Sequence, residues 1–477
     1  MGPALLPGNL HRLKKNRAAA VIANGLPATQ MPAFAGKLTA AQIDLLVETI
    51  YTPPAQTPVW GEAQIRASRV VYLPEAAQVK ADVVKPVYSA DPLNVFLVVE
   101  AGDHHVTVLD GDRLEPIKRF KSRFALHGGP KYSSDGRFVY FASRDGWISK
   151  YDIYNLKLIA EIRAGINTRN LAVSHDGRYV MVANYLPHSL VLLDAVDLKP
   201  IRYYEVKNNE GKTSRISAVY TAPPRDSFIA ALKDIPEVWQ INYADDPPVG
   251  FGQWMHDYNP ESGEKPEIEK FPVRRIPVDD YLDDFFFDQE YVSIIGASRE
   301  GKGQVVDLDV GRVIVPDLAL PGMPHLGSGI TWEYQGKTVL ATPNLRENNV
   351  SVIDMESWET IKHIETLGPG FFMRSHENTP YAWVDVFFGP NRDVMHVIDK
   401  RSLEIVKTLR PEPGKTAAHI EFTRDGKYAL LSIWDPDGAV IVYDAATLEE
   451  VKRLPMNKPS GKYNVYNKIT RSAGTSH

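Results

Sequence analysis

The sequence predicts an all-β protein, an eight-bladed β-propeller preceded by a small α-helical segment. Two observations predict it. From about residue 96 onward, an apolar strand that ends in aspartate recurs, with 42 to 47 residues between adjacent copies, and Asp-Gly turns precede several runs of β-forming residues. A repeat of this length that holds several short strands is typical of one four-stranded propeller blade. A β-sandwich or a pair of smaller β domains is the alternative that the pattern leaves open.

The first 56 residues predict helices rather than strands. Residues 9–24 have a helical pattern that stops at Gly25. Thr39 and Gln42 have the spacing of a capping box, which predicts that a second helix begins there. A helical pair this small buries little surface alone, so we expect it to cap the propeller or to be half of a larger unit. The residues expected on the buried face of the second helix are Ile43, Leu46, Val47 and Ile50.

Two repeated phrases define the blades. Asp135-Gly136, Asp176-Gly177 and Asp425-Gly426 each precede a strand, and the glycine supplies the positive φ that a tight hairpin needs. The second phrase is an apolar strand closed by an acidic residue. Its copies end at Asp110, Asp152, Asp194, Asp307, Asp354, Asp399 and Asp444.

The middle of the chain departs from the repeat in two places. Residues 216–245 keep two strands, at 228–232 and 238–241, but lack the closing aspartate. With this unit the count of blades is eight. Residues 250–278 contain Pro, Gly and Glu in place of the strand pattern, which predicts a long loop between two blades.

Composition narrows the classes of function. The chain has 477 residues and a net charge of −5 without long runs of one sign, which gives no reason to expect nucleic acid or an anionic membrane as partner. No apolar stretch approaches the roughly 20 residues that cross a bilayer. There are no cysteines, so disulfides, thiolate metal sites and covalent attachment of a c-type haem are excluded in this chain.

Residues 57–477 resemble the d1-haem propeller of the cytochrome cd1 nitrite reductase family. The similar pieces are Pro58-Val59-Trp60-Gly61, Phe124-Ala125-Leu126-His127, Arg144-Asp145-Gly146, Pro324-His325, Ser375-His376 and the ending 460–467, which reads SGKYNVYN. The ending is the most specific, because propellers in general do not close that way. The resemblance implies haem d1, or its precursor dihydro-haem d1, at the centre of the blades.

Residues 1–56 resemble the second half of a small c-type cytochrome domain. They have a helix, a loop with Met31-Pro32 and a terminal helix, and in such domains the loop methionine ligates the iron of haem c. The half with the Cys-x-x-Cys-His motif is missing, so we expect the coding sequence to begin upstream and Met31 to be a ligand only if that half exists. A packed core methionine is the alternative for Met31.

The family has three kinds of member: nitrite reductases, dihydro-haem d1 dehydrogenases and a propeller-only protein of haem d1 biosynthesis. Nitrite reductases place two histidines over the distal face of the haem. The second matches His325, but the first falls at Asp283, within Tyr281-Leu282-Asp283-Asp284. A carboxylate there would bring negative charge towards nitrite. This favours the dehydrogenase, with nitrite reduction, a non-catalytic haem-delivery protein and a haem-free scaffold as alternatives.

The resemblance also implies the residues that bind the tetrapyrrole. His127 would be the proximal ligand of the d1-haem iron. Arginine binds carboxylates through two parallel hydrogen bonds, so Arg144, Arg169 and Arg374 are candidates for the haem carboxylates, with His376 beside the last of them. A buried histidine with its hydrogen bonds satisfied is the alternative for His127, and a surface position is the alternative for Arg169.

The dehydrogenation removes two electrons and two protons from a propionate and leaves an acrylate, so a proton acceptor must lie near the side chain. His419 and Tyr463 are the candidates, because an unperturbed histidine accepts protons at neutral pH and a tyrosine is better suited to donate or relay them. His325 would orient the substrate or ligate from the distal face. Ordinary structural roles remain the alternative for all three.

The partners and the compartment follow from the resemblance alone. It implies a c-type cytochrome as electron acceptor, nitrite reductase as a recipient of the finished haem, a role in denitrification and a periplasmic location. The sequence itself shows no signal peptide at residues 1–7.

Overall fold

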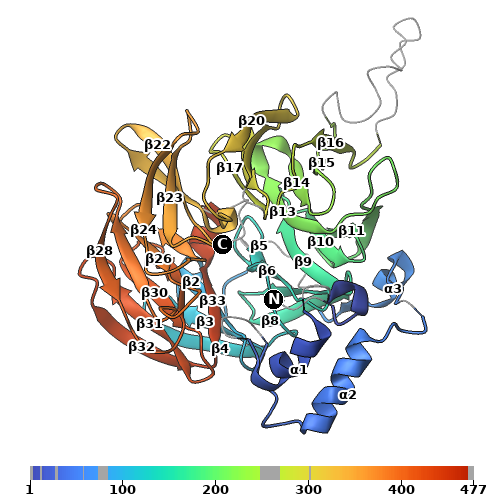
Figure 1. The fold of residues 1–477 in the computed structure, drawn as a ribbon, viewed down its shortest axis with the longest axis horizontal. Coiled ribbons are helices and arrows are strands. Elements are labelled where there is room, and N and C mark those ends of the chain that lie inside the picture. The colour runs from blue at the N-terminus through green and yellow to red at the C-terminus, as the bar shows by residue number, and fades with distance from the viewer. Residues whose placement is uncertain are drawn as a thin grey trace, which may run out of the picture.

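The computed structural model describes residues 4–10, 13–26, 31–56, 58–73, 84–247, 269–299 and 302–470. Within these residues the strands form eight sheets arranged in a ring (Figure 1). The prediction of an eight-bladed propeller is therefore confirmed, and the β-sandwich is excluded. Among the described helices, none is long and apolar enough to cross a membrane.

Blades 1 to 4 occupy the first half of the ring. Blade 1 closes it, because the last strand of the chain pairs with the first strand of the blade series. Blade 1 consists of β33 (Pro459–Asn464), β2 (Val95–Glu100), β3 (His105–Asp110) and β4 (Glu115–Lys121). Blade 2 has β5 (Lys131–Tyr132), β6 (Phe138–Ala142), β7 (Trp147–Asp152) and β8 (Lys157–Arg163), with β1 (Val70–Val71) added at its outer edge. Blade 3 has β9 (Asn167–Val173), β10 (Tyr179–Leu186), β11 (Ser189–Asp194) and β12 (Pro200–Glu205); blade 4 has β13 (Ile216–Ala222), β14 (Ser227–Leu232), β15 (Glu237–Asn242) and β16 (Val273–Pro277).

Blades 5 to 8 complete the ring with the same order of strands from the centre outward. Blade 5 has β17 (Asp284–Phe287), β18 (Ser293–Ala297), β19 (Gly303–Asp307) and β20 (Arg312–Leu318); blade 6 has β21 (Ile330–Tyr334), β22 (Lys337–Pro343), β23 (Asn349–Asp354) and β24 (Thr360–Glu365). Blade 7 has β25 (Met373–Ser375), β26 (Tyr381–Asp385), β27 (Met395–Asp399) and β28 (Glu404–Leu409); blade 8 has β29 (Ala417–Phe422), β30 (Tyr428–Ile433), β31 (Gly438–Asp444) and β32 (Glu450–Met456).

The recurring aspartate ends the third strand of a blade and shapes the turn that follows. The Asp110 carboxylate accepts the backbone N–H groups of Asp112 and Arg113 at 2.8 and 3.1 Å, and Leu114 then adopts a positive φ of 57°. The side chain thus replaces a backbone acceptor in the turn. The Asp-Gly turns also form as predicted, for Gly136 has φ 73° and the Asp135 carboxylate accepts the Arg137 N–H.

The long insertion lies within a blade and not between two blades as predicted. Val273–Pro277 forms β16, the fourth strand of blade 4, and pairs with β15. The prediction was wrong there because the outer strand of a blade is half exposed and carries little apolar signal. The part of the predicted loop at 250–268 lies outside the described residues.

The helices differ in part from the prediction. The first, α1 (Lys15–Asn24), begins later than expected, since Pro7 starts a separate 3-10 turn, η1 (Pro7–Asn9), and Lys14 is extended. It ends at Gly25 with φ 70°, as predicted. The second, α2 (Ala40–Tyr51), has the expected capping box at Thr39 and Gln42.

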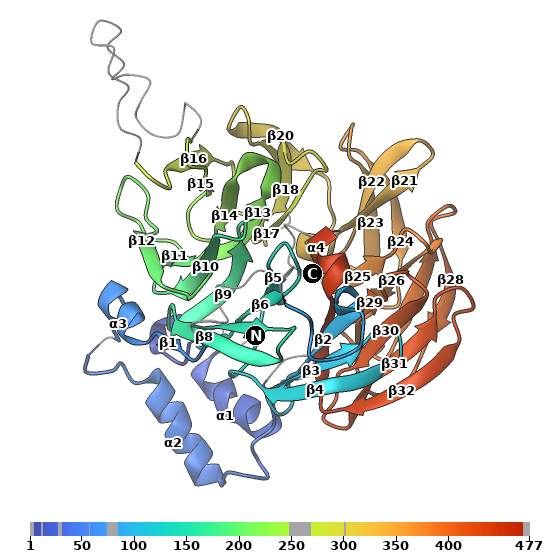
Figure 2. The same ribbon diagram turned by 180° about the vertical axis from the view of Figure 1, so that it is seen from behind.

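The two helices pack against each other around a small apolar cluster. Ile43 and Val47 are buried in it, but Leu46 is 40% exposed, so the predicted apolar face is wrong for that residue. Met31 is a partly buried member of the same cluster. Figure 2 shows α2 at the outer edge of the ring.

The remaining helices are short. They are α3 (Glu62–Ala67), α4 (Val465–Thr470), η4 (Pro92–Asn94), η5 (Pro223–Arg225) and η7 (Leu326–Ser328). Trp60, in the segment before α3, donates a hydrogen bond from its indole N–H to the Arg163 carbonyl of blade 2 at 2.9 Å. The last helix, α4, follows β33 directly and lies near the middle of the ring (Figure 2).

A buried ion pair in blade 2 gives a test of the fold. Arg137 and Asp152 are 1% and 0% exposed, and their charged atoms lie 2.6 Å apart. We expect Arg137→Met to lower the free energy of unfolding by about 3–5 kcal/mol, because it leaves the buried Asp152 charge without the cation that pairs with it. The measurement is the midpoint of urea unfolding, provided that the dependence of the unfolding free energy on urea concentration is the same as in the wild type. Arg453→Met, which breaks an exposed pair with Glu450, should cost less than about 1 kcal/mol, and equal shifts for the two variants would contradict the prediction.

Candidate functional site

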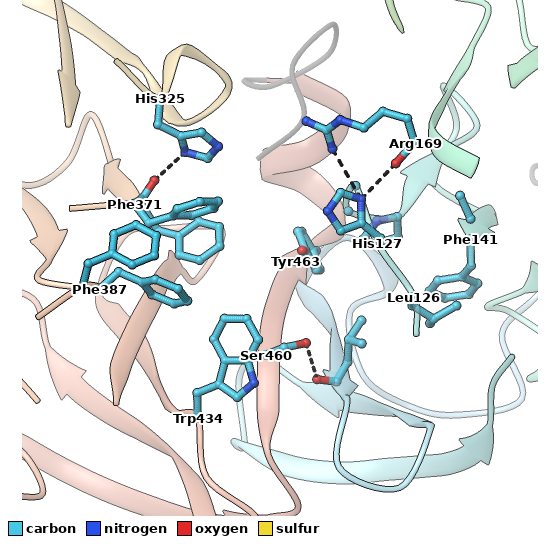
Figure 3. Close-up of a pocket in the computed structure, with 17 residues that line it drawn as sticks. Leu126, His127, Phe141, Arg169, His325, Phe371, Phe387, Trp434, Ser460 and Tyr463 are labelled. Atoms are coloured by element: carbon cyan, nitrogen blue, oxygen red, sulfur yellow. Dashed lines mark hydrogen bonds between the residues drawn. The ribbon is translucent and has the colours of Figure 1, made fainter. Parts of the chain in front are cut away.

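A cavity of about 1130 Å³, including the space at its mouth, lies at the centre of the ring. Its walls come from the two inner strands of several blades and from the loops next to them (Figure 3). The lining residues are Val99, Leu126, His127, Gly128, Gly129, Pro130, Phe141, Ala142, Arg169, His325, Phe371, Phe372, Phe387, Phe388, Trp434, Ser460 and Tyr463.

One wall of the cavity is aromatic. The ring of Phe371 lies 4.6 Å from that of Phe372 and 5.1 Å from that of Phe387, centre to centre, and Phe387 lies 5.2 Å from Trp434. Such a wall offers apolar, polarisable surface to a flat conjugated ligand. These residues were not predicted from the sequence. The signal was a pair of adjacent phenylalanines directly after a Pro-Gly loop, a place where bulky apolar side chains are unusual.

His127 stands on the opposite wall, in the loop before β5 (Figure 3). Its Nδ1 lies 2.9 Å from the Arg169 carbonyl oxygen. The donor-only Nη1 of Arg169 is farther from Nδ1, at 3.4 Å, and a carbonyl only accepts. The shorter contact therefore places the proton on Nδ1 and the lone pair on Nε2. The positive φ values of Gly128 and Gly129, 80° and 65°, turn the chain away immediately after the imidazole.

The charge state of His127 suits a metal ligand. Burial, followed by the positive charges of Arg144 and Arg169, holds its pKa well below the ordinary value, so the ring is neutral at pH 7. A neutral imidazole whose other nitrogen donates to a carbonyl is the usual arrangement of a metal-bound histidine.

His325 faces the cavity from the other side, just before η7. Its Nδ1 donates to the Phe371 carbonyl at 2.6 Å, and the two rings lie 3.9 Å apart. Burial lowers the pKa of His325, so this imidazole is also neutral. The cavity therefore has one imidazole on each of two facing walls, one from blade 2 and one from the loop before blade 6.

The predicted arginines lie at different depths. Arg169 lines the cavity, and its Nε donates to the Ser217 carbonyl at 2.7 Å. Arg144 lies outside the lining, where its Nη1 donates to the Thr168 carbonyl at 3.0 Å and its guanidinium stands over the Tyr185 ring. Burial lowers the pKa of Arg144 to about 10, which still leaves it charged at neutral pH.

Tyr463 and His419 meet at the edge of the cavity. Tyr463, on β33, lines it, whereas His419, on β29, is 2% exposed and lies directly behind. Their ring centres are 5.1 Å apart in an edge-on contact. Burial, and then the charge of Lys462, holds the pKa of His419 well below its ordinary value, and burial raises the pKa of Tyr463.

Two further predicted residues, His376 and Arg374, also lie outside the cavity lining. The His376 imidazole accepts the Asn378 N–H at Nδ1 and donates from Nε2 to the Arg424 carbonyl at 3.2 Å, so it fastens blade 7 to blade 8. The strand β25 ends at Ser375, so its alternation does not carry His376 to the centre. Arg374 lies near Glu421, with a nitrogen-to-oxygen distance of 4.0 Å.

The expectation for Asp283 needs correction. Its carboxylate is 2% exposed and is paired with Lys233 and with Arg299, the latter at 2.9 Å. The negative charge is therefore neutralised by one cation from blade 4 and one from blade 5, and it does not confront a ligand. The neighbouring Asp284 accepts a hydrogen bond from the Tyr220 hydroxyl at 2.7 Å.

Two lysines near Arg374 were also not predicted from the sequence. Lys131 and Lys468 line a second pocket on the side of α4. Burial, and then the charge of Arg374, lowers the pKa of Lys131 to about 7, and burial and Lys131 lower that of Lys468. Arg374 and Lys468 lie near the Glu421 carboxylate and Lys131 lies near that of Asp284. The two lysines are only partly charged at neutral pH, and an anionic ligand would raise their pKa again, which suits a ligand with several carboxylates.

The donor set fits a planar iron tetrapyrrole. The aromatic wall provides stacking surface, two neutral imidazoles face one another across the cavity, Arg169 lines it, and Lys131 and Lys468 line the second pocket, which shares Pro130 with it. His127 would hold the iron from one side, and such a group would supply conjugation and electron transfer.

Comparisons with known proteins agree with this site. A family model described as "Cytochrome D1 heme domain" matches residues 90–468. The dihydro-heme d1 dehydrogenase of Pseudomonas aeruginosa is 56% identical over 477 residues, which is 100% of this chain and 91% of that protein. A solved structure described as "Dihydro-heme d1 dehydrogenase NirN in complex with DHE" matches with a TM-score of 0.85 and 55% identity, over 98% of this chain and 95% of that one. Protein NirF of Stutzerimonas stutzeri is 26% identical over 376 residues, 76% of this chain and 90% of that protein.

Proposed function

The chain belongs to the cytochrome D1 heme domain family, and from that premise we propose that it is the oxidoreductase that completes haem d1 by dehydrogenating a propionate of dihydro-haem d1 to an acrylate. The observation that carries this is the 56% identity to dihydro-heme d1 dehydrogenase across the whole chain. The cavity supports it, because its two imidazoles face one another across a space with an aromatic wall.

The reaction breaks one C–H bond on each of the two methylene carbons of the propionate. Two electrons leave through the conjugated ring to an external acceptor, and two protons leave to the protein and then to water. The protein's part is therefore to hold the ring, to fix the carboxylates and to accept protons. His127 would bind the iron, and Arg169 in the cavity wall would supply positive charge for the carboxylates, with Arg374, Lys131 and Arg144 adding to it from outside the lining.

We assign proton transfer to Tyr463 and His419. Tyr463 touches the cavity, and its raised pKa keeps the phenol protonated, so it passes a proton on rather than holding a charge. His419 stands behind it as the acceptor. Negative carboxylates of the bound substrate oppose the charges of Lys462 and Arg374, so we expect binding to raise the pKa of His419 again.

The electron route and the compartment are proposals from family resemblance. A c-type cytochrome in the periplasm would take the two electrons one at a time, and nitrite reductase would receive the finished haem. We propose residues 1–56 as a partial cytochrome c-like unit, with Met31 as a haem c ligand only in a chain that contains the missing half, and residues 57–477 as the d1-haem propeller. The separate apolar cluster of α1 and α2 supports this division.

The test is anaerobic incubation of the purified protein with dihydro-haem d1 and oxidised c-type cytochrome. We expect the tetrapyrrole to lose two hydrogen atoms, seen as a mass change, while two equivalents of cytochrome are reduced. Nitrite with a reductant is the matched control, and it should give no nitric oxide above background. Tight binding without a mass change would contradict the proposal and favour a delivery role instead.

A further inference from the structure

The backbone of His419 is held in an unusual conformation. Its φ is 54°, a left-handed value that side chains other than glycine rarely adopt. The pairing of β29 with β30 shifts register between Ala418 and Ile420, so His419 is the extra residue of a β-bulge. Bulges of this kind re-aim a side chain, and here the bulge directs the imidazole towards Tyr463.

Two buried side chains hold this bulge in place through hydrogen bonds to its backbone. The His419 N–H donates to Asp385 Oδ2 at 3.2 Å, and Lys462 Nζ donates to the His419 carbonyl. Lys462 also donates to the Ser432 hydroxyl at 2.8 Å. Asp385 lies on blade 7, His419 on blade 8 and Lys462 on the closing strand of blade 1, so three blades fix one residue.

The same carboxylate also organises the aromatic wall. Asp385 Oδ1 accepts the N–H groups of Phe371 and Phe372 at 2.8 and 3.0 Å. The Phe371 carbonyl in turn accepts the proton of His325 Nδ1. Asp385 is therefore connected to both His419 and His325, although neither imidazole lies on its blade.

The fold of a blade does not require a carboxylate here. Asp385 is the last residue of the second strand of blade 7 and is 0% exposed. A buried carboxylate is costly unless it is fully hydrogen-bonded, so its presence calls for a local reason. In five other blades the second strand ends on an aliphatic residue, and in blade 6 it ends on Pro343; only blade 1, with Glu100, also ends this strand on a carboxylate. The five aliphatic ends are Ala142, Leu186, Leu232, Ala297 and Ile433.

We infer that Asp385 is a positioning residue that, with Lys462, holds the bulge aiming His419 at Tyr463 and, through Phe371, fixes the tautomer of His325. The inference rests on the proposed roles of these imidazoles. Asp385 acts through them and does not itself line the cavity.

The test is Asp385→Asn. An amide has one accepting oxygen, so the variant keeps either the two phenylalanine N–H bonds or the His419 bond, but not both. We expect kcat to fall at least tenfold, while KM and the affinity for dihydro-haem d1 change less than threefold. Asp399→Asn is the matched control. It lies on the same blade, and its carboxylate also accepts two backbone N–H groups, those of Arg401 and Ser402, but in the turn between the two outer strands. It should retain wild-type kcat.

The pH profile separates positioning from simple stability. Burial raises the pKa of Asp385 to about 7, against the opposing effect of its three N–H donors and of Lys462. The groups that face it are these N–H donors on the segment before β25 and on β29, together with Lys462 on β33. Only the ionised carboxylate accepts all three N–H groups, so wild-type kcat should fall as the pH drops through about 7. Asp385→Asn should lack this acid limb, whereas a merely structural role would lower stability and leave the limb in place.

Three outcomes overturn the inference. The first is wild-type kcat in Asp385→Asn, and the second is an unchanged acid limb in that variant. The third is a crystal structure of the variant in which His419 keeps its positive φ and its contact with Tyr463. The crystal structure tests the inference even if the wild-type protein does not turn over dihydro-haem d1. Such a lack of turnover would refute only the proposed function. Should Asp385→Asn not fold, Lys462→Met removes the grip on the His419 carbonyl and should also lower kcat with binding retained, and wild-type kcat there overturns the inference.

Discussion

Replacing His419 with alanine is expected to slow the conversion of dihydro-haem d1 by about 10²- to 10⁴-fold, the range over which a positioned acid or base accelerates reactions. The substrate should still bind, because His419 lies behind Tyr463 and outside the cavity lining. The measurement is single-turnover conversion followed by mass, with affinity taken from a separate titration of the visible absorption.

The control for this prediction is His363→Ala. His363 is exposed on β24, the outer strand of blade 6, and its Nδ1 lies 3.2 Å from the Ser351 hydroxyl. Its loss should leave both conversion and binding unchanged. Full conversion by His419→Ala would refute the role of this imidazole, and it would leave Tyr463 to deliver the proton to water by itself.

The second large effect concerns the iron. We expect His127→Ala to weaken the binding of haem d1 by at least about 10- to 100-fold, the loss seen when a residue that merely orients a metal ligand is removed. The absorption bands should also shift, because the iron loses its axial nitrogen. Titration of the haem-free protein with haem d1 measures both the affinity and the absorption shift.

Added imidazole distinguishes ligation from packing in this variant. The alanine leaves a space beside the Arg169 carbonyl, and free imidazole that enters it should restore the wild-type spectrum. An unaltered spectrum in His127→Ala without imidazole would show that the iron is bound from elsewhere, and the facing His325 would then be the first residue to test.

Local chemistry explains which parts of the fold could be predicted from the sequence. The strand-ending aspartates accept N–H groups from residues two and three positions later in the chain, and the Asp-Gly turns join neighbouring strands. Both features therefore depend only on residues that are close together in the sequence. The strand β16 was missed because its pairing with β15 spans a long insertion. Leu46 was wrongly predicted to be buried because helical spacing alone does not give the width of the face of α2 that packs against α1.

The site was predictable only where one segment carries its own signal. His127 stands out beside two glycines, and Tyr463 lies in the closing motif. Asp385 has no such mark, because its importance comes from donors on other segments that approach only when blades 7 and 8 pack together. The misplacement of His376 has the same origin, since its partners belong to a turn of the next blade.

The closing strand β33 has a consequence for how the molecule is made. It completes the sheet of blade 1 against β2, and it also carries Lys462 and Tyr463. A chain shortened before β33 would therefore lack both the strand that closes the ring and the two side chains proposed for proton transfer and positioning. We expect such a chain to be inert rather than partly active, so that only chains synthesised through this strand would process the pigment.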